Sequence, residues 1–105
     1  MQLTKLKLVT IIAEEILKDR LTKKVQELGA TGASFHRTQG VGSRGARHND
    51  MFGENVQMKV ICSAEVAERI LTYVAENYYE HYAIVAWLAD VEVMRGDDYV
   101  KKSTT

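Results

Sequence analysis

The sequence predicts a small α+β domain in which a four-stranded antiparallel sheet carries two helices on one face. Three observations support this class: segments with the alternation of strands, two segments with a helical apolar stripe, and the order in which these segments follow one another. The chain has 105 residues, so we expect one domain spanning 1–105 with a modest hydrophobic core.

The first half of the chain has the pattern of strand, helix and strand. Apolar residues between Leu3 and Ile12 follow a period of two, and both sides of this strand become apolar towards its end. Glutamates at 14 and 15 then open a helix, and Gly29 ends it. The apolar stripe of this helix consists of Leu17, Leu21, Val25 and Leu28. Residues 32–38 are compatible with a second strand.

The second half repeats this order. Residues 56–62 alternate as a third strand, and Ser63 is a favourable N-cap for a second helix. The run from Tyr82 to Ala89 is continuously apolar and continues with alternation to Val93. We therefore expect it to be the central strand, covered on both faces, with Trp87 as a large core anchor. The polar tail, 101–105, is expected to be frayed.

This order of elements is the ferredoxin-like βαββαβ arrangement. A long loop joins its second and third strands. The face of the sheet without helices would still present apolar side chains from three strands. We therefore expect several subunits to pack their sheets together.

Charge and composition narrow the range of functions. Fourteen Lys and Arg balance fourteen Asp and Glu, whereas a general binder of nucleic acid or membrane surfaces needs a basic excess. The single cysteine, Cys62, excludes an intramolecular disulfide, and its apolar neighbours favour a buried thiol. No secretory signal or long apolar span is visible, so a cytoplasmic location is expected.

The sequence shows no enzymatic signature. His36, His48 and His81 lack the spacing of metal ligands, and Ser43 has no neighbouring base, so neither a metal site nor catalytic residues are expected. The first and third strands lack the aromatic side chains on which an RNA-recognition module stacks bases. An acylphosphatase-like enzyme is disfavoured too, because the first strand runs directly into a helix.

The connection between the second and third strands, about 40–55, is far longer than the usual hairpin loop. Its first part combines Gly40 and Gly42 with Ser43, Arg44 and Arg47. Backbone N–H groups of glycine-rich turns and the donor forks of arginine together bind phosphate well. A solvated basic loop has the same composition, so the residues alone leave both interpretations open.

The tip of this loop carries Met51 and Phe52, an apolar pair among polar residues. Such a pair either anchors the loop against its own body or docks on a partner. A ligand at the root could change the order of the tip and so permit or forbid docking. The loop is therefore a candidate switch.

The order of elements, the long loop, the GVGSRGAR root and the segment YYEHYA at 78–83 resemble the PII signalling superfamily over nearly the whole chain. Within it, the chain looks most like the cyanobacterial PII-like carbon-control proteins of the SbtB type, partners of the sodium-dependent bicarbonate transporter SbtA. The resemblance implies a homotrimer that binds adenine nucleotides (cAMP, AMP, ADP and ATP) in clefts between subunits. A divalent cation could accompany ATP.

The resemblance also implies roles for individual residues, with the long loop as the T-loop. The nucleotide-binding residues would be Gly40, Gly42, Ser43, Arg44, Arg47, Ile84 and Val85. Met51 and Phe52 would contact the transporter and recruit the protein peripherally to the inner membrane. Such a protein would report energy or cyclic-nucleotide state to inorganic-carbon uptake. Two alternatives stay open: a slow nucleotide di- or triphosphate hydrolase at the same site, and a metal-binding trimer of similar fold.

Overall fold

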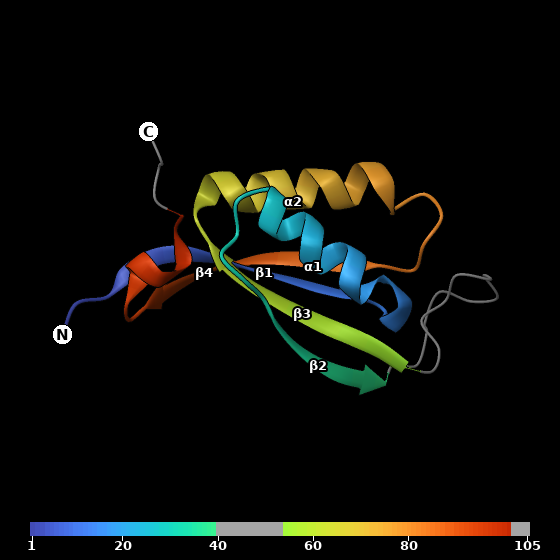
Figure 1. Ribbon diagram of the computed structural model, residues 1–105, viewed down its shortest axis with the longest axis horizontal. Coiled ribbons are helices and arrows are strands. Elements are labelled where there is room, and N and C mark those ends of the chain that lie inside the picture. The colour runs from blue at the N-terminus through green and yellow to red at the C-terminus, as the bar shows by residue number, and fades with distance from the viewer. Residues whose placement is uncertain (40–53, 102–105) are drawn as a thin grey trace.

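The computed structural model describes residues 1–39 and 54–101 (Figure 1). Its strands are β1 (Thr4–Glu14), β2 (Ser34–Gln39), β3 (Glu54–Cys62) and β4 (Val85–Val93). Its helices are α1 (Lys18–Glu27) and α2 (Ala64–Asn77), and two short 3-10 helices, η1 (Glu15–Leu17) and η2 (Gly96–Tyr99), follow β1 and β4. The predicted βαββαβ class is confirmed.

The strands form one sheet in the order β2-β3-β1-β4, and each neighbouring pair is antiparallel. Both helices cover the same face of this sheet (Figure 1). The other face carries no α-helix among the described residues. We call it the open face.

The prediction that 82–93 forms the central strand is wrong. β4 lies at an edge of the sheet, and β1 and β3 occupy the centre. Trp87 is 43% exposed and is not a core anchor of this chain. A strand that is covered on both faces has a continuous apolar sequence, whether the cover comes from its own domain or from another subunit. The apolar run therefore could not show whether this strand is central or at an edge of the sheet.

The hydrophobic core lies between the two helices and the sheet. Every second residue of β1 and β3 points into it, and one stripe of each helix packs down onto these strands. The central members are Val9, Ile11, Ala13, Met58, Val60 and Cys62 from the strands, and Leu21, Val25, Ala67, Ile70 and Val74 from the helices. The stripes expected from the sequence therefore face the core, and burial of this apolar area stabilises the domain.

Both helices have identifiable end signals. The Ser63 hydroxyl oxygen accepts the backbone N–H of Val66 at 3.2 Å, which confirms Ser63 as the N-cap of α2. Gly29 follows α1 with φ of +124°, a conformation in which a side chain would be strained. A Cβ there would also lie 2.8 Å from Val66, so glycine is required for both reasons.

The start of the first helix differs from the prediction. Glu14 still belongs to β1, where it pairs with Asn55 of β3, and η1 separates it from α1. Pairing with β3 holds the chain extended for two residues beyond Ile12. The glutamates therefore precede the α-helix instead of forming its first turn.

The end of α1 is capped by side chains from distant parts of the chain. Arg69 donates to the carbonyl oxygen of Leu28 at 3.0 Å, and Lys101 donates to that of Gln26 at 2.6 Å. Cations at this end of a helix satisfy orphan carbonyls and suit the helix dipole. Lys101 is therefore anchored, contrary to the prediction of a frayed tail from 101 onwards. Residues 102–105 lie outside the described part.

Candidate functional site

Most residues of the predicted site lie outside the described part of the chain. These are Gly40, Gly42, Ser43, Arg44 and Arg47 of the phosphate cradle and Met51 and Phe52 of the tip. Ile84 and Val85 are described. The structure therefore bears on the site through the two strand ends that hold the loop and through the start of β4.

The strand register brings these parts to the same end of the sheet. Gln39, the last residue of β2, pairs with Glu54, the first of β3, and together they form the loop root. Ile12 of β1 pairs with Gln57 on one side and with Val85 on the other. With neighbouring strands about 4.8 Å apart, Val85 lies about 10 Å from Gln57 across β1.

The start of β4 borders a small hollow. Tyr79, Tyr82, Ile84 and Val85 line a volume of about 220 Å³. The side chain of Ile84 is buried, with 2% of the residue exposed, so a ligand at the surface could reach little of Ile84 besides its main chain. Val85 is half-buried and belongs to the open face, because it is the cross-strand partner of Ile12.

Arg37, near the end of β2, forms ion pairs with carboxylates of two neighbouring segments. Its guanidinium lies 2.9 Å from a carboxylate oxygen of Glu15 in η1 and 3.8 Å from one of Glu54 in β3. Two positions earlier, on the same face of β2, the ring of Phe35 lies 5.0 Å from the ammonium of Lys18 in α1. The end of β2 is thereby tied to the start of the first helical segment. Arg37 begins the glycine- and arginine-rich stretch, but its charge is already matched within the domain.

The open face presents apolar side chains along β1, β3 and β4. They alternate with the core residues and are in part exposed. Its members are Leu6, Leu8 and Ile12 from β1, Ile61 from β3, and Val85, Trp87, Ala89 and Val91 from β4. A surface of this composition is typical of a contact between proteins.

A second hollow, of about 510 Å³, lies on the open face beside η2. Leu8 and Ile61 form its apolar floor, while Lys59, Asp98 and Tyr99 add polar groups. None of these residues is among the site residues predicted from the sequence. This hollow was missed because it exists only once η2 folds back beside the sheet, and no local pattern indicates that contact.

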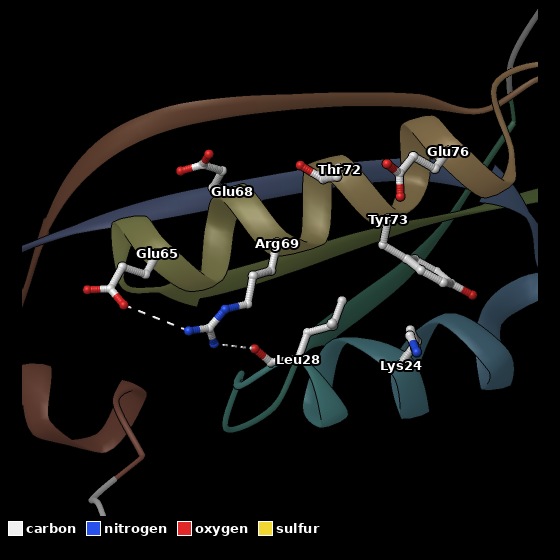
Figure 2. A pocket seen from close by; sticks show the side chains of 8 residues that line it. All are labelled: Lys24, Leu28, Glu65, Glu68, Arg69, Thr72, Tyr73 and Glu76. Carbon is white, nitrogen blue, oxygen red and sulfur yellow. Dashed lines mark hydrogen bonds and ion pairs between the residues drawn. The ribbon is translucent and has the colours of Figure 1, made fainter.

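A third hollow, of about 560 Å³, lies between α1 and α2 (Figure 2). Its two cations are engaged within the domain: Arg69 lies 3.7 Å from Glu65 and also binds Leu28, and the ammonium of Lys24 lies 5.1 Å from the ring of Tyr73. Glu68 and Glu76 complete the rim. This arrangement does not favour an anion such as phosphate.

Three titratable groups of the described residues have a pKa that departs clearly from the usual value. Burial raises the pKa of the Cys62 thiol to about 11. Burial and a 3.3 Å hydrogen bond with Tyr78 raise the pKa of Tyr73 to about 12. The ammonium of Lys7 lowers the pKa of Asp90. All three shifts lead away from the neutral range in which a general base works best.

Two further features are absent from the described residues. Residues 1–39 and 54–101 hold no group of three or more His, Cys, Asp or Glu side chains that could bind a metal ion. In the same residues, neither helix has the length and apolar character needed to cross a membrane.

Comparison with known proteins now decides the family. The family model of the nitrogen regulatory protein P-II matches residues 6–98. The chain belongs to the PII family. This PII protein is also 47% identical to a chain described as a PII-like signalling protein from Thermus thermophilus, with a TM-score of 0.82 over 95% of this chain and 100% of that one.

More distant structures show the same fold. CPII from Thiomonas intermedia, bound to ADP, AMP and acetate, is 21% identical, with a TM-score of 0.80 over 94% of this chain and 98% of that one. A second structure of CPII, bound to ADP and bicarbonate, is 19% identical, with a TM-score of 0.76 over 93% of this chain and 97% of that one. At these identities the likeness concerns the fold.

Proposed function

We propose that this PII-family protein is a non-enzymatic signalling protein that binds adenine nucleotides (cAMP, AMP, ADP and ATP) in the clefts between the subunits of a homotrimer. The single observation that supports this most directly is the strand register. It brings the loop root and the start of β4 to one end of the sheet, although they lie some thirty residues apart in sequence. A nucleotide can therefore contact both.

The proposed contacts follow the chemistry of the residues. Ser43, Arg44 and Arg47 hold phosphate, and Gly40 and Gly42 lend backbone N–H groups. Ile84 and Val85 offer main chain beside the hollow at the start of β4. Support for the choice of adenine nucleotides comes from the CPII structures, which contain ADP and AMP. A divalent cation could accompany ATP.

In the proposed trimer, a neighbouring subunit forms the other side of each nucleotide cleft. The open face leaves Trp87 43% exposed in the single chain. Burying such a surface is favourable, at about 25 cal/mol for each Å² of apolar area. We propose that this face packs against two other copies around a three-fold axis.

We propose that the protein regulates inorganic-carbon uptake. In this scheme Met51 and Phe52 dock on a sodium-dependent bicarbonate transporter of the SbtA type, so that a cytoplasmic protein is recruited peripherally to the inner membrane. The sequence resemblance to SbtB-type proteins motivates this step, and the CPII structure with bicarbonate is consistent with a link to carbon. Nucleotide binding at the root would set whether the tip can dock.

Isothermal titration calorimetry with cAMP, AMP, ADP and ATP tests the proposal, with GTP as a control for the base. We expect saturable binding of adenine nucleotides and weaker binding of GTP. If none of the four binds at concentrations up to the millimolar range, the proposal is wrong. Chromatography of the same samples tests the non-enzymatic assignment, because nucleotides should be recovered unchanged.

A further inference from the structure

We propose that the hollow between α1 and α2 is a docking groove for a basic amphipathic helix of a partner protein. We call this hollow the helix groove. It runs along α2 from Glu65 to Glu76 and reaches Lys24 and Leu28 at the end of α1. Both helices lie on the face of the sheet opposite the open face, so packing of the open face against other copies leaves the groove accessible (Figure 1). The inference does not depend on nucleotide binding.

The helix groove has the length that a short helix needs. Its α2 wall, from Glu65 to Glu76, spans about 17 Å at a rise of 1.5 Å per residue. The end of α1 forms the facing wall, and the volume between the walls is about 560 Å³. About three turns of a bound helix can therefore lie along α2 and touch both walls.

The charge of the groove favours a cationic occupant. Three carboxylates and two cations line it, and both cations are already engaged within the domain. Arg69 lies 3.7 Å from a carboxylate oxygen of Glu65 (Figure 2). The ammonium of Lys24 lies 5.1 Å from the ring centre of Tyr73. The remaining charge of the lining is negative, so it is complementary to a basic segment.

Glu68 and Glu76 are the carboxylates with which an occupant can pair. Both residues are exposed, and neither forms an ion pair within residues 1–39 and 54–101. They are about 12 Å apart along the axis of α2, which is close to the rise of two helical turns. Positions i and i+7 of a helix share one face. Arginines at these two positions of the partner can therefore pair with both carboxylates.

An apolar floor lies between the two helices. Tyr73 points from α2 towards α1, where Leu28 faces it (Figure 2). Tyr73 is half-buried, and its ring packs edge-on against Tyr78 with the ring centres 5.7 Å apart, which restricts the ring. Apolar side chains at positions i+3 and i+4 of the partner would cover this floor. The expected occupant thus has the pattern Arg-x-x-Leu-Leu-x-x-Arg on one face.

The experiment uses the whole protein and a fluorescein-labelled, alanine-rich helical peptide that contains Arg-x-x-Leu-Leu-x-x-Arg. Fluorescence anisotropy at low ionic strength measures the affinity, and amide chemical shifts locate the bound peptide. Glu68→Gln and Glu76→Gln should each weaken binding by about 1.5- to 5-fold, the range for an exposed ion pair. The effects should multiply in the double variant, because the two side chains are well separated. Added salt should weaken binding of the peptide to wild-type protein.

Two controls separate the groove from general attraction between charges. Glu92→Gln makes the same change at an exposed side chain of β4, outside the groove, and should leave the affinity unchanged. A peptide with serine in place of both leucines keeps the charges and should bind about tenfold more weakly, because the apolar floor loses its partner.

Each outcome supports or overturns the inference. Shift changes confined to the groove sides of α1 and α2, together with weaker binding by the double variant, support it. Equal affinity for wild type and the double variant overturns it, as does the absence of peptide binding up to millimolar concentration. Spermidine that binds as tightly as the peptide would show a site for small polycations instead.

Self-association is the other occupant that the test distinguishes. If light scattering without peptide shows a larger assembly that the double variant reduces in mass, a second copy fills the groove and the inference is wrong. Calorimetry of the double variant with AMP should give the affinity of wild type. Failure of the inference would therefore leave the proposed nucleotide function intact.

Discussion

Thr10 and Trp87 are directly opposed across β1 and β4, yet Thr10 is 1% exposed and Trp87 is 43% exposed. Cross-strand partners lie on the same face of a sheet, so both belong to the open face. The polar residue on the central strand is covered, while the largest apolar side chain of the edge strand faces solvent. A second subunit that covers the indole would complete the burial of this cross-strand pair.

The first prediction concerns this indole. Wild-type protein should have a mass of three chains of 11.9 kDa each by light scattering, and Trp87→Ala should shift it towards one chain, because the apolar contact is lost. Leu88→Ala is the control. Leu88 is 45% exposed but pairs with Val9, so it belongs to the opposite face, and its loss should leave the mass unchanged. Equal masses for wild type and Trp87→Ala would contradict the proposed interface.

The second prediction concerns the proposed phosphate contact of Arg47. Arg47→Ala should weaken nucleotide binding by about 1.5–3 kcal/mol, the usual range for a hydrogen bond to a charged group. Arg20→Ala, which removes an exposed cation of α1, should have a much smaller effect. Calorimetry with AMP measures both. An affinity unchanged by Arg47→Ala would favour the interpretation of this loop as a solvated basic segment.

The third prediction compares two glycines. A Cβ at Gly96 would overlap the side chain of Thr4 at the start of β1, whereas a Cβ at Gly32 has no neighbour within 4 Å. Gly96→Ala should therefore lower the free energy of unfolding by about 1–3 kcal/mol, since overpacking forces the strand end to shift. Gly32→Ala should change it by about 0.5 kcal/mol or less. Urea unfolding gives both values, and similar midpoints for the two variants would refute the close approach of η2 to β1.

The fourth prediction concerns the buried thiol of Cys62. The pKa of this thiol is about 11 in the folded state, against 9.0 for a free thiol. Between these two pH values the folded protein keeps the thiol proton, whereas the unfolded chain releases it. This contribution to stability is complete below pH 9 and is lost as the pH rises towards 11. Thiol-labelling reagents should react slowly with native protein at pH 8 and rapidly in denaturant.

Cys62→Ala provides the control for the alkaline effect. Its unfolding free energy should fall less steeply between pH 9 and 11 than that of wild type, and the difference isolates the thiol from Tyr73, whose pKa is also raised. Rapid labelling of native protein would show that the strand opens readily or that the thiol is accessible.

Sequence reasoning succeeded where neighbours along the chain decide the structure. Period-two alternation located β1 and β3, and Ser63 and Gly29 marked helix ends, because strand faces and helix caps depend on residues a few positions apart. It failed for η1, where pairing of Glu14 with Asn55 keeps the chain extended. It also failed for Lys101, whose bond to Gln26 spans 75 residues.

The fold class, the core-facing stripes of the helices, and the glycine- and arginine-rich composition of the long loop could be predicted from the order of the residues alone. The edge position of β4, the exposure of Trp87 and the shared pairing of Glu15 and Glu54 with Arg37 became evident only in the folded chain. The physical reason is that alternation and capping are short-range effects. Strand order and ion pairing depend on which distant segments come together when the core closes.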